Sequence, residues 1–204
     1  MTSTPSRLSE RHRALALDAS VVLNLLGSGR PADVLRLLGR EVVVEEQVLA
    51  EVRRDPSSGG PARESLDALR AAGLLRYERL SARGYLGFLA LTGAAPPDDL
   101  DDGEAATIAH AEDVGAVPVM DDKKAARIMG TRRPGEVTLT TMDLLASVEV
   151  VGDLTEGELA DLVFAALGKA RMRVLPLFRP WVVALIGKER AESCPSLGKV
   201  AGLR

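Results

Sequence analysis

The fold of this 204-residue chain is decided by the stretch Ala14-Leu15-Ala16-Leu17-Asp18-Ala19-Ser20. Four apolar residues run directly into an acid, and residues 19–26 then form a second apolar run that Gly27 ends. This pattern predicts a short buried strand, an aspartate at its carboxyl end, and a helix. A continuously apolar strand is typical of a parallel sheet that is covered on both faces.

The same alternation of strand and helix continues along the chain. It predicts an α/β fold of three layers, a central parallel sheet flanked by helices, over residues 14–150. After Gly152 the pattern changes to an amphipathic helix that starts near Thr155 and a short apolar helix after Trp181, so residues 151–204 are expected to form a helical C-terminal extension. The further strands are predicted at 42–44, 74–80, 117–120 and 137–139, and the helices between them at 31–38, 47–53, 64–72, 85–91, 105–113, 123–129 and 140–147.

Composition excludes several classes of protein. With 46% hydrophobic and 27% charged residues the chain is globular, and a net charge of −3 argues against capture of nucleic acid by the surface as a whole. Aromatic residues make up 3%, too few for a stacking platform. The single cysteine, Cys194, cannot form an internal disulfide or a thiolate zinc site. No export signal and no membrane span is evident, so a cytoplasmic protein is expected.

Charge along the chain is segregated by sign. Nine acids and no lysine or arginine lie between Asp98 and Asp122, and five bases follow before Glu136. From Ala165 to the end, eight bases oppose Glu189 and Glu192. An acidic centre flanked by basic segments could hold a cation and attract a polyanion, whereas the alternative is a solvated loop and a basic tail.

Acidic residues follow the strands at the points where a parallel sheet binds ligands. Asp18 follows the first strand, and Asp121 and Asp122 follow the strand at 117–120. Glu104 and Glu51 lie early in helices that can start at the same edge. Carboxylates gathered in one place repel one another and raise each other's pKa, unless a hard cation such as Mg²⁺ or Mn²⁺ neutralises them. Such a cation can promote attack on a phosphodiester, so the acids predict a metal-dependent phosphodiesterase-like site.

Each acid also has a purely structural interpretation. Asp18 could be a helix N-cap, and Glu104 could be the reciprocal capping partner of Asp101. Glu51 could pair with a neighbouring arginine, and the Asp121-Asp122 pair could complement a helix dipole. Together, in this order along the chain, the acids favour a shared site.

Four acidic motifs occur in order, and together they carry a resemblance. They are Leu17-Asp18-Ala19-Ser20, Val48-Leu49-Ala50-Glu51, Asp102-Gly103-Glu104-Ala105 and Met120-Asp121-Asp122-Lys123 with Arg127 after them. In these motifs and in the strand and helix pattern of residues 14–150, the chain resembles PIN-domain ribonucleases, the family that includes VapC-like toxins of toxin–antitoxin pairs. It is most similar to a subgroup with Gly-Glu-Ala at the third acid and an Asp pair before Lys or Arg.

The resemblance implies a PIN fold, one or two Mg²⁺ or Mn²⁺ ions, and hydrolysis of single-stranded RNA. The resemblance also implies an antitoxin protein as partner, a homodimer, and no association with a membrane. Asp18, Glu104 and Asp122 would hold the metal, with Asp121 as an extra ligand or a supporting group. Glu51 would position water or a second ion, which makes Asp18, Glu51, Glu104 and Asp122 the implied catalytic residues. The implied substrate contacts are Ser20, Thr140, Lys123 and Arg127, with Lys124 as a further phosphate contact.

Two other classes of function are alternatives to a nuclease. The chain departs from the PIN pattern in its third acid, which is Glu104 in place of aspartate, and in the acidic approach at 98–102. A catalytically inactive PIN-like binding or scaffold module is therefore the alternative. A phosphoreceiver domain or a haloacid-dehalogenase-like phosphatase is excluded by order, because the acidic pair comes late and Asp18 is followed by Ala19-Ser20.

Overall fold

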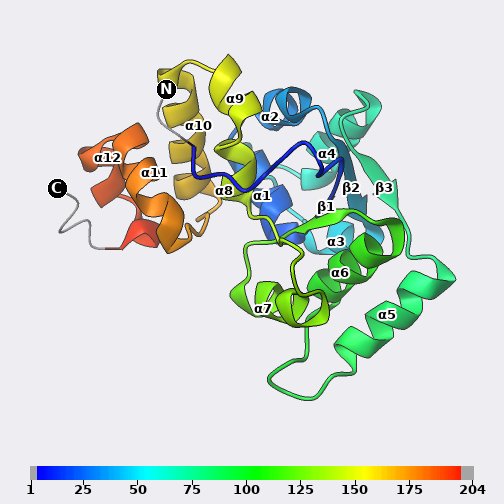
Figure 1. The fold of residues 1–204 in the computed structure, drawn as a ribbon. Helices are drawn as coiled ribbons and strands as arrows, with labels where there is room; N and C mark the ends of the chain where they lie inside the picture. Colours follow the sequence, from blue (N-terminus) through cyan, green and yellow to red (C-terminus); the bar gives the residue numbers. More distant parts are fainter. Residues whose placement is uncertain (1–3, 199–204) are drawn as a thin grey trace.

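A four-stranded, all-parallel sheet forms the centre of the computed structural model, which describes residues 4–198 (Figure 1). The strand order is β3-β2-β1-β4, so the predicted central parallel sheet flanked by helices is confirmed. The strands are β1 (Ala14–Leu17), β2 (Glu41–Glu45), β3 (Arg76–Glu78) and β4 (Val117–Val119).

Strand β1 is central because it pairs on both sides. Its Leu15 lies opposite Val42 of β2 on one side and Val117 of β4 on the other. Just past the strand, the backbone N–H of Asp18 donates to the carbonyl oxygen of Val119 at 3.1 Å. This bond places the carboxyl end of β1 beside that of β4, and it brings the first and last acidic motifs together.

Alternate residues of the strands face two different cores. Leu15 and Leu17 of β1 belong to the larger core, whereas Ala16, between them, faces the opposite side with Ala111. The helices whose residues enter the larger core are α1 (Ala19–Gly27), α2 (Pro31–Leu38), α3 (Glu46–Glu51), α4 (Ala62–Ala71), α8 (Thr141–Leu145), α9 (Val148–Asp153), α10 (Glu156–Lys169), α11 (Arg179–Ile186) and α12 (Lys188–Glu192).

A separate group of helices covers the other face of the sheet. Helix α6 (Asp102–Val114) packs on the strands, α5 (Ala82–Thr92) lies along α6, and α7 (Lys123–Arg132) follows β4 (Figure 1). Leu91, Ile108 and Met129, one from each helix, are buried in a common cluster. The start of α6, with its Gly-Glu motif, is thereby held at the edge of the sheet.

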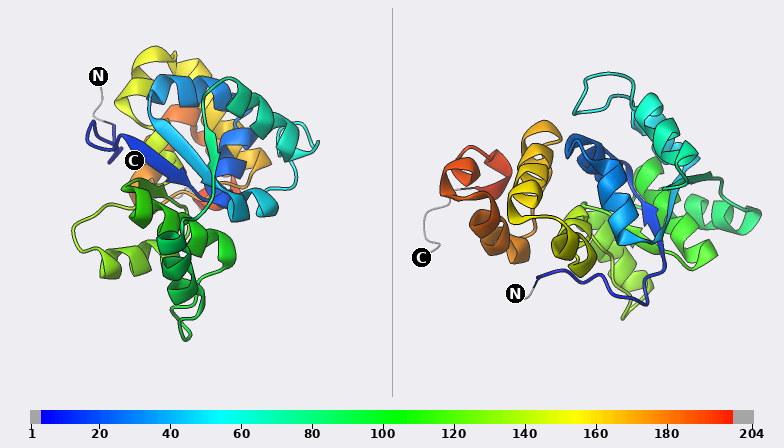
Figure 2. Two further views of the ribbon diagram at one scale, coloured as in Figure 1. Left: turned by 90° about the vertical axis from the view of Figure 1, so that its right-hand side faces the viewer. Right: turned by 90° about the horizontal axis from the view of Figure 1, so that it is seen from above.

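The C-terminal helices stack outward from α1. Helix α10 packs on α1, α11 packs on α10, and α12 follows after a short turn (Figure 2). Short 3₁₀ turns lie on either side of α11 and α12: η1 (Pro176–Phe178) precedes α11, and η2 (Pro195–Leu197) follows α12. Residue 151, where the sequence predicts the extension to begin, lies within α9. Residues 199–204 of the predicted extension, with the bases Lys199 and Arg204, lie outside the described residues.

Two local predictions differ from the structure. The strand expected at 137–139 is wrong, because only Leu139 pairs with Val119, in an isolated parallel bridge. Pro134 and Gly135 precede the segment and Thr140 already caps α8, so a single residue is left in extended pairing. The helix expected at 140–147 ends at Leu145, and Ser147 is instead the N-cap of a further helix, α9, which the sequence pattern does not predict. Across residues 4–198, none of the helices is both long and apolar enough to cross a membrane.

Candidate active site: an acidic cleft at the carboxyl edge of the sheet

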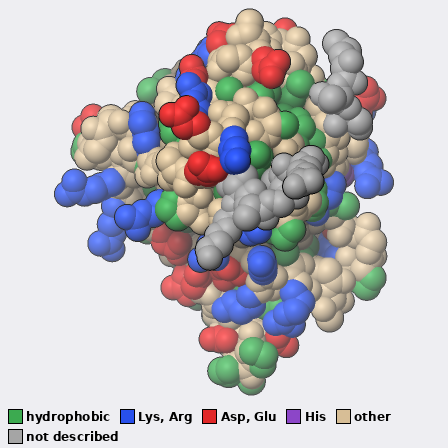
Figure 3. Space-filling model, turned by 90° about the vertical axis from the view of Figure 1, so that its left-hand side faces the viewer, with side chains coloured by type: hydrophobic (Ala, Val, Ile, Leu, Met, Phe, Trp, Pro, Cys, Tyr) green, Lys and Arg blue, Asp and Glu red, His purple; other side chains and the backbone are tan. Residues whose placement is uncertain are grey.

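The acidic motifs meet in one cleft of about 360 Å³, at the edge where β1 and β4 end. Its walls come from the start of α1, the end of α3, the start of α6, the junction between β4 and α7, and the segment after α10. Figure 3 shows acidic side chains gathered on this side of the molecule, with Lys and Arg side chains beside them. The acids that line the cleft are Asp18, Glu51, Asp101, Glu104, Asp121 and Asp122.

Asp18 is both the N-cap of α1 and a wall of the cleft. One carboxylate oxygen, Oδ2, accepts hydrogen bonds from the Ser20 backbone N–H at 3.2 Å and from the Ser20 hydroxyl at 2.7 Å. Burial raises the pKa of Asp18, and the two Ser20 bonds partly oppose this effect. Ser20, implied by the resemblance as a substrate contact, therefore orients Asp18 and also lines the cleft.

Glu104 lies in the first turn of α6, where its neighbours are other acids. Asp101, the N-cap of this helix, accepts a hydrogen bond from the Glu104 backbone N–H at 2.9 Å. Burial, followed by the charges of Asp101 and Asp122, raises the pKa of Glu104 to about 7. A carboxyl group with this pKa can exchange a proton near neutral pH. Asp101, which the sequence predicts only as a helix N-cap, is a further acid of the cleft.

Glu51 reaches the cleft because the residue opposite its carboxylate is a glycine. A Cβ atom on Gly103 would lie 2.5 Å from Glu51 Oε1 and 2.6 Å from Oε2. Burial, followed by the charge of Asp101, raises the pKa of Glu51. The glycine of the Gly-Glu motif thus allows the end of α3 to approach the first turn of α6.

We expect Gly103→Ala to displace the Glu51 carboxylate while leaving the fold intact. The methyl group would meet only the end of a flexible side chain, and alanine is the better helix former. Loss of a well-placed supporting group at a metal site costs about 10–100-fold in metal affinity or activity. Gly157→Ala is the matched control, because Gly157 occupies the same position in the first turn of α10 and has open space around it. Equal Mn²⁺ titrations, followed by thermal melting, for the two variants would contradict the prediction.

Asp121 is held from behind by a buried polar network. Its Oδ2 accepts hydrogen bonds from Asn24 Nδ2 at 2.7 Å and from the Thr141 hydroxyl at 2.5 Å, and its Oδ1 accepts one from the Thr141 backbone N–H at 2.9 Å. Burial raises the pKa of Asp121, whereas these bonds favour its ionised form. Asn24 and Thr141 were not predicted as site residues, although a single amide within the apolar helix α1 was a usable signal.

Asp122 faces the cleft from the start of α7. Its Oδ1 accepts hydrogen bonds from the backbone N–H groups of Lys124 and Ala125 at 2.7 and 3.1 Å, which makes it the N-cap of this helix. Its other oxygen, Oδ2, lies 3.9 Å from the Arg173 guanidinium. The structural and functional interpretations of Asp122 are therefore compatible, because capping uses one oxygen and leaves the other toward the cleft.

Four of the implied substrate contacts, Thr140, Lys123, Lys124 and Arg127, are absent from the described residues that line the cleft. The Lys124 ammonium donates to the carbonyl oxygen of Asp99 at 2.7 Å. Thr140 is buried and its hydroxyl donates to Asp143 Oδ2 at 2.7 Å, so it serves the capping box of α8. Arg127 pairs with Asp98 at 2.6 Å, and Lys123 is exposed in the first turn of α7. The bases that do line the cleft are Arg171 and Arg173, which the sequence marks only as part of a basic segment.

The donor set has the chemistry of a site for a hard divalent cation. Carboxylate oxygens are the preferred protein ligands of Mg²⁺ and Mn²⁺. Burial, and after it the charges of neighbouring carboxylates, raises the pKa of Glu51 and Glu104, and a bound cation would offset both effects. Among residues 4–198, no group of three or more His, Cys, Asp or Glu side chains is arranged closely enough to hold a metal ion. The residues fit the ion by type, and their side chains would have to draw together to bind it.

The protonation of Glu104 predicts how stability depends on pH without metal. The folded pKa of about 7 exceeds the ordinary value of 4.5, so between these values the folded protein binds more protons than the unfolded chain. Stability that Glu104 contributes is therefore lost as pH rises from about 4.5 to about 7. In EDTA, we expect Glu104→Gln to raise the melting temperature more at about pH 7.5 than at about pH 5. An equal increase at both values would refute this assignment.

An acidic cleft at the carboxyl edge of a parallel α/β sheet defines a class of domain suited to metal-assisted phosphodiester chemistry. The chain belongs to the PIN-domain family, since a family model with that description matches residues 14–174. PIN domains are generally nucleases and typically use divalent metal ions. No curated protein and no solved structure matches this chain.

Proposed function

We propose that this protein is an endoribonuclease that hydrolyses phosphodiester bonds of single-stranded RNA with Mg²⁺ or Mn²⁺. The observation that carries the proposal is the gathering of carboxylates from separate elements in one cleft: Asp18 after β1, Glu51 at the end of α3, Glu104 at the start of α6 and Asp122 after β4. Asp18, Glu104 and Asp122 would hold the cation, with Asp121 as a fourth group fixed by Asn24 and Thr141.

The roles of the side chains follow from their surroundings. A bound divalent cation would supply charge neutralisation and a more acidic water. Ser20 orients Asp18 by hydrogen bonds, and Asn24 and Thr141 do the same for Asp121. These hydrogen bonds therefore fix how the two carboxylates are directed in the cleft. Glu51 would orient the attacking water and take up its proton. The water oxygen would bond to phosphorus, the bond to one ribose oxygen would break, and that leaving oxygen would take up a proton from solvent.

The test is metal-dependent cleavage of single-stranded RNA by protein first stripped with EDTA. A ligand at a hundred times its Kd stabilises the native state by about 2.7 kcal/mol, which for a chain of this size raises Tm by about 5–10 °C. We expect Mn²⁺ to produce that rise and to permit cleavage, and EDTA to abolish both. If neither ion produces a rise in Tm or a cleavage product, the proposal is rejected.

A catalytically inactive RNA-binding or scaffold module is the second candidate. The observation that favours it is the lack of any closely arranged ligand group within residues 4–198. A protein of that kind would bind RNA equally well with EDTA and with Mn²⁺, and it would release no product. The two candidates are therefore separated by the same experiment.

The resemblance also supports a VapC-like toxin with a cytoplasmic location. In that role an antitoxin protein would inhibit the enzyme, and the working state would be a homodimer. Growth of cells that express the wild-type chain alone, compared with cells that express Asp18→Asn, tests toxicity. Normal growth in both would count against the toxin role without affecting the nuclease.

A further inference from the structure

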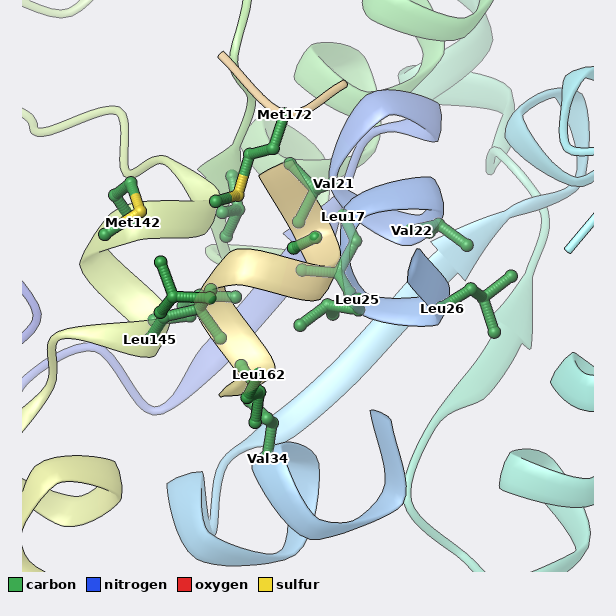
Figure 4. Close-up of a cluster of buried hydrophobic side chains, with 14 of the residues drawn as sticks. Leu17, Val21, Val22, Leu25, Leu26, Val34, Met142, Leu145, Leu162 and Met172 are labelled. Carbon is green, nitrogen blue, oxygen red and sulfur yellow. The ribbon is translucent and has the colours of Figure 1, made fainter. Parts of the chain in front are cut away.

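The segment that follows α10 forms one wall of the cleft, and basic and apolar residues alternate along it. Arg171 and Arg173 line the cleft, whereas Met172 and Val174 are buried in the larger core. Met172, which is 1% exposed, lies among side chains of α1 and α8 in Figure 4. The apolar residues thus anchor the segment from below and leave the two arginines on the side of the acids.

Close backbone packing holds this segment in place. A Cβ atom on Gly27, the last residue of α1, would lie 2.7 Å from the Cβ of Ala170, so only glycine permits this approach. The Met172 backbone N–H donates to the carbonyl of Ala166 at 3.3 Å, and Arg171 adopts a left-handed conformation with φ 54°. The positions of the arginine backbones are therefore set by the core, independently of any ligand.

The guanidinium groups are available to a ligand. Arg173 Nη1 lies 3.9 Å from Asp122 Oδ2, and its side chain is 79% exposed, so this ion pair is long and solvated. Arg171 is exposed and forms no ion pair with any residue that the structure describes. Arg127, by contrast, already pairs with Asp98 at 2.6 Å.

Arg171 and Arg173 provide positive charge beside the carboxylates of the cleft. A cleft lined by six carboxylates repels a polyanion, and of the described residues along its walls only Arg171 and Arg173 are basic. Guanidinium groups bind phosphate oxygens through two parallel N–H donors, and such contacts position a strand without reading its sequence. A strand held by its phosphates at this wall would lie next to the acids.

We propose that Arg171 and Arg173 bind backbone phosphates of single-stranded RNA beside the acidic cleft and hold the strand there against the repulsion of the carboxylates. The proposal deepens the proposed function, on which it rests for the reaction that follows binding. The binding step itself does not require that the RNA be cleaved.

The test measures binding of a fluorescein-labelled oligouridylate of about 12 nucleotides across a range of salt concentrations. The variants are Arg171→Gln, Arg173→Gln and the double variant, which remove charge and keep an unbranched side chain. Arg179→Gln is the control, since Arg179 is an exposed base at the start of α11 and lies outside the cleft. Each phosphate contact to a single strand contributes about 0.7 to the slope of log Kd against log salt concentration, so the double variant should lose about 1.4. At low salt its Kd should rise at least about tenfold.

The results separate this proposal from the proposed function. The Mn²⁺-induced rise in Tm should persist in the arginine variants, because the carboxylates are intact. If the wild type cleaves RNA and the double variant matches Arg179→Gln in Kd and slope, the phosphate contacts are refuted and the nuclease stands. If nothing is cleaved but the slope falls as expected, the contacts stand and the nuclease is rejected. A wild type that binds no oligouridylate at the lowest salt overturns the binding proposal.

Discussion

Asp18→Asn is expected to lower metal-dependent RNA cleavage by at least about a hundredfold and to remove the stabilisation by Mn²⁺. Replacement of a group that only supports a metal ligand lowers metal affinity or activity by about 10–100-fold. Asp18 is proposed as a ligand itself, so a larger loss is expected. The substitution removes one negative charge and keeps the shape of the side chain. Asparagine is as good an N-cap as aspartate, so the bond from the Ser20 N–H to the cap survives.

The control for this prediction is the stability of the variant without metal. Burial disfavours the ionised form of Asp18, as its raised pKa shows, so the neutral amide should melt at the same or a higher temperature in EDTA. Asp161→Asn, at an exposed residue of α10 that pairs with Arg190, removes the same charge away from the cleft. Cleavage by Asp18→Asn within about tenfold of this control would exclude Asp18 from the metal site.

Asp143→Ala is expected to destabilise the fold by about 3 kcal/mol, the largest effect on stability that we predict. The carboxylate is fully buried and accepts three hydrogen bonds from Arg7, through its backbone N–H, Nε and Nη2, at 2.6–3.0 Å. It also accepts two from the backbone N–H and hydroxyl of Thr140. The substitution leaves all five donors without their acceptor. Removal of one partner of a buried pair costs about 3–5 kcal/mol, and the lower end applies because the Arg7 side chain is 37% exposed and can regain water.

Chemical unfolding in urea measures this effect. Asp161→Ala is the control, because a surface pair such as Asp161 and Arg190 contributes at most about 1 kcal/mol. In thermal melts the same difference corresponds to about 6–12 °C. If the two variants unfold within about 1 kcal/mol of each other, the buried contact between the N-terminal segment and α8 contributes little.

The architecture could be predicted because it follows from local patterns. Continuous apolar runs mark strands with both faces covered, and Val42-Val43-Val44 shows this as clearly as the first strand does. Capping residues also act locally, so Asp101 and Thr155 correctly mark the starts of α6 and α10. The predicted strand at 137–139 failed because three apolar-rich residues do not show how many of them will pair.

The candidate site was predictable only in part. Acids at the carboxyl ends of parallel strands must lie near one edge, which is why Asp18 and Asp122 were expected together. Glu104 was expected with them because its helix can start at the same edge. Which of two neighbouring side chains contacts an acid of the cleft depends on packing from other elements. The Thr140-Thr141 pair illustrates this, since Thr141 contacts Asp121 and Thr140 turns to Asp143.

By itself, the sequence determined the class of fold, most of the strands and helices along the chain, and the acids that could share a cation, because strand runs, caps and strand ends are properties of neighbouring residues. Tertiary structure alone decided three features. It set Asn24 and Thr141 behind Asp121, it joined Arg7 to Asp143 across 136 positions, and it brought the arginines after α10 to the cleft. The physical reason is that these contacts join segments far apart in the chain, and only the packing of α1, α8 and α10 in one core brings them within reach.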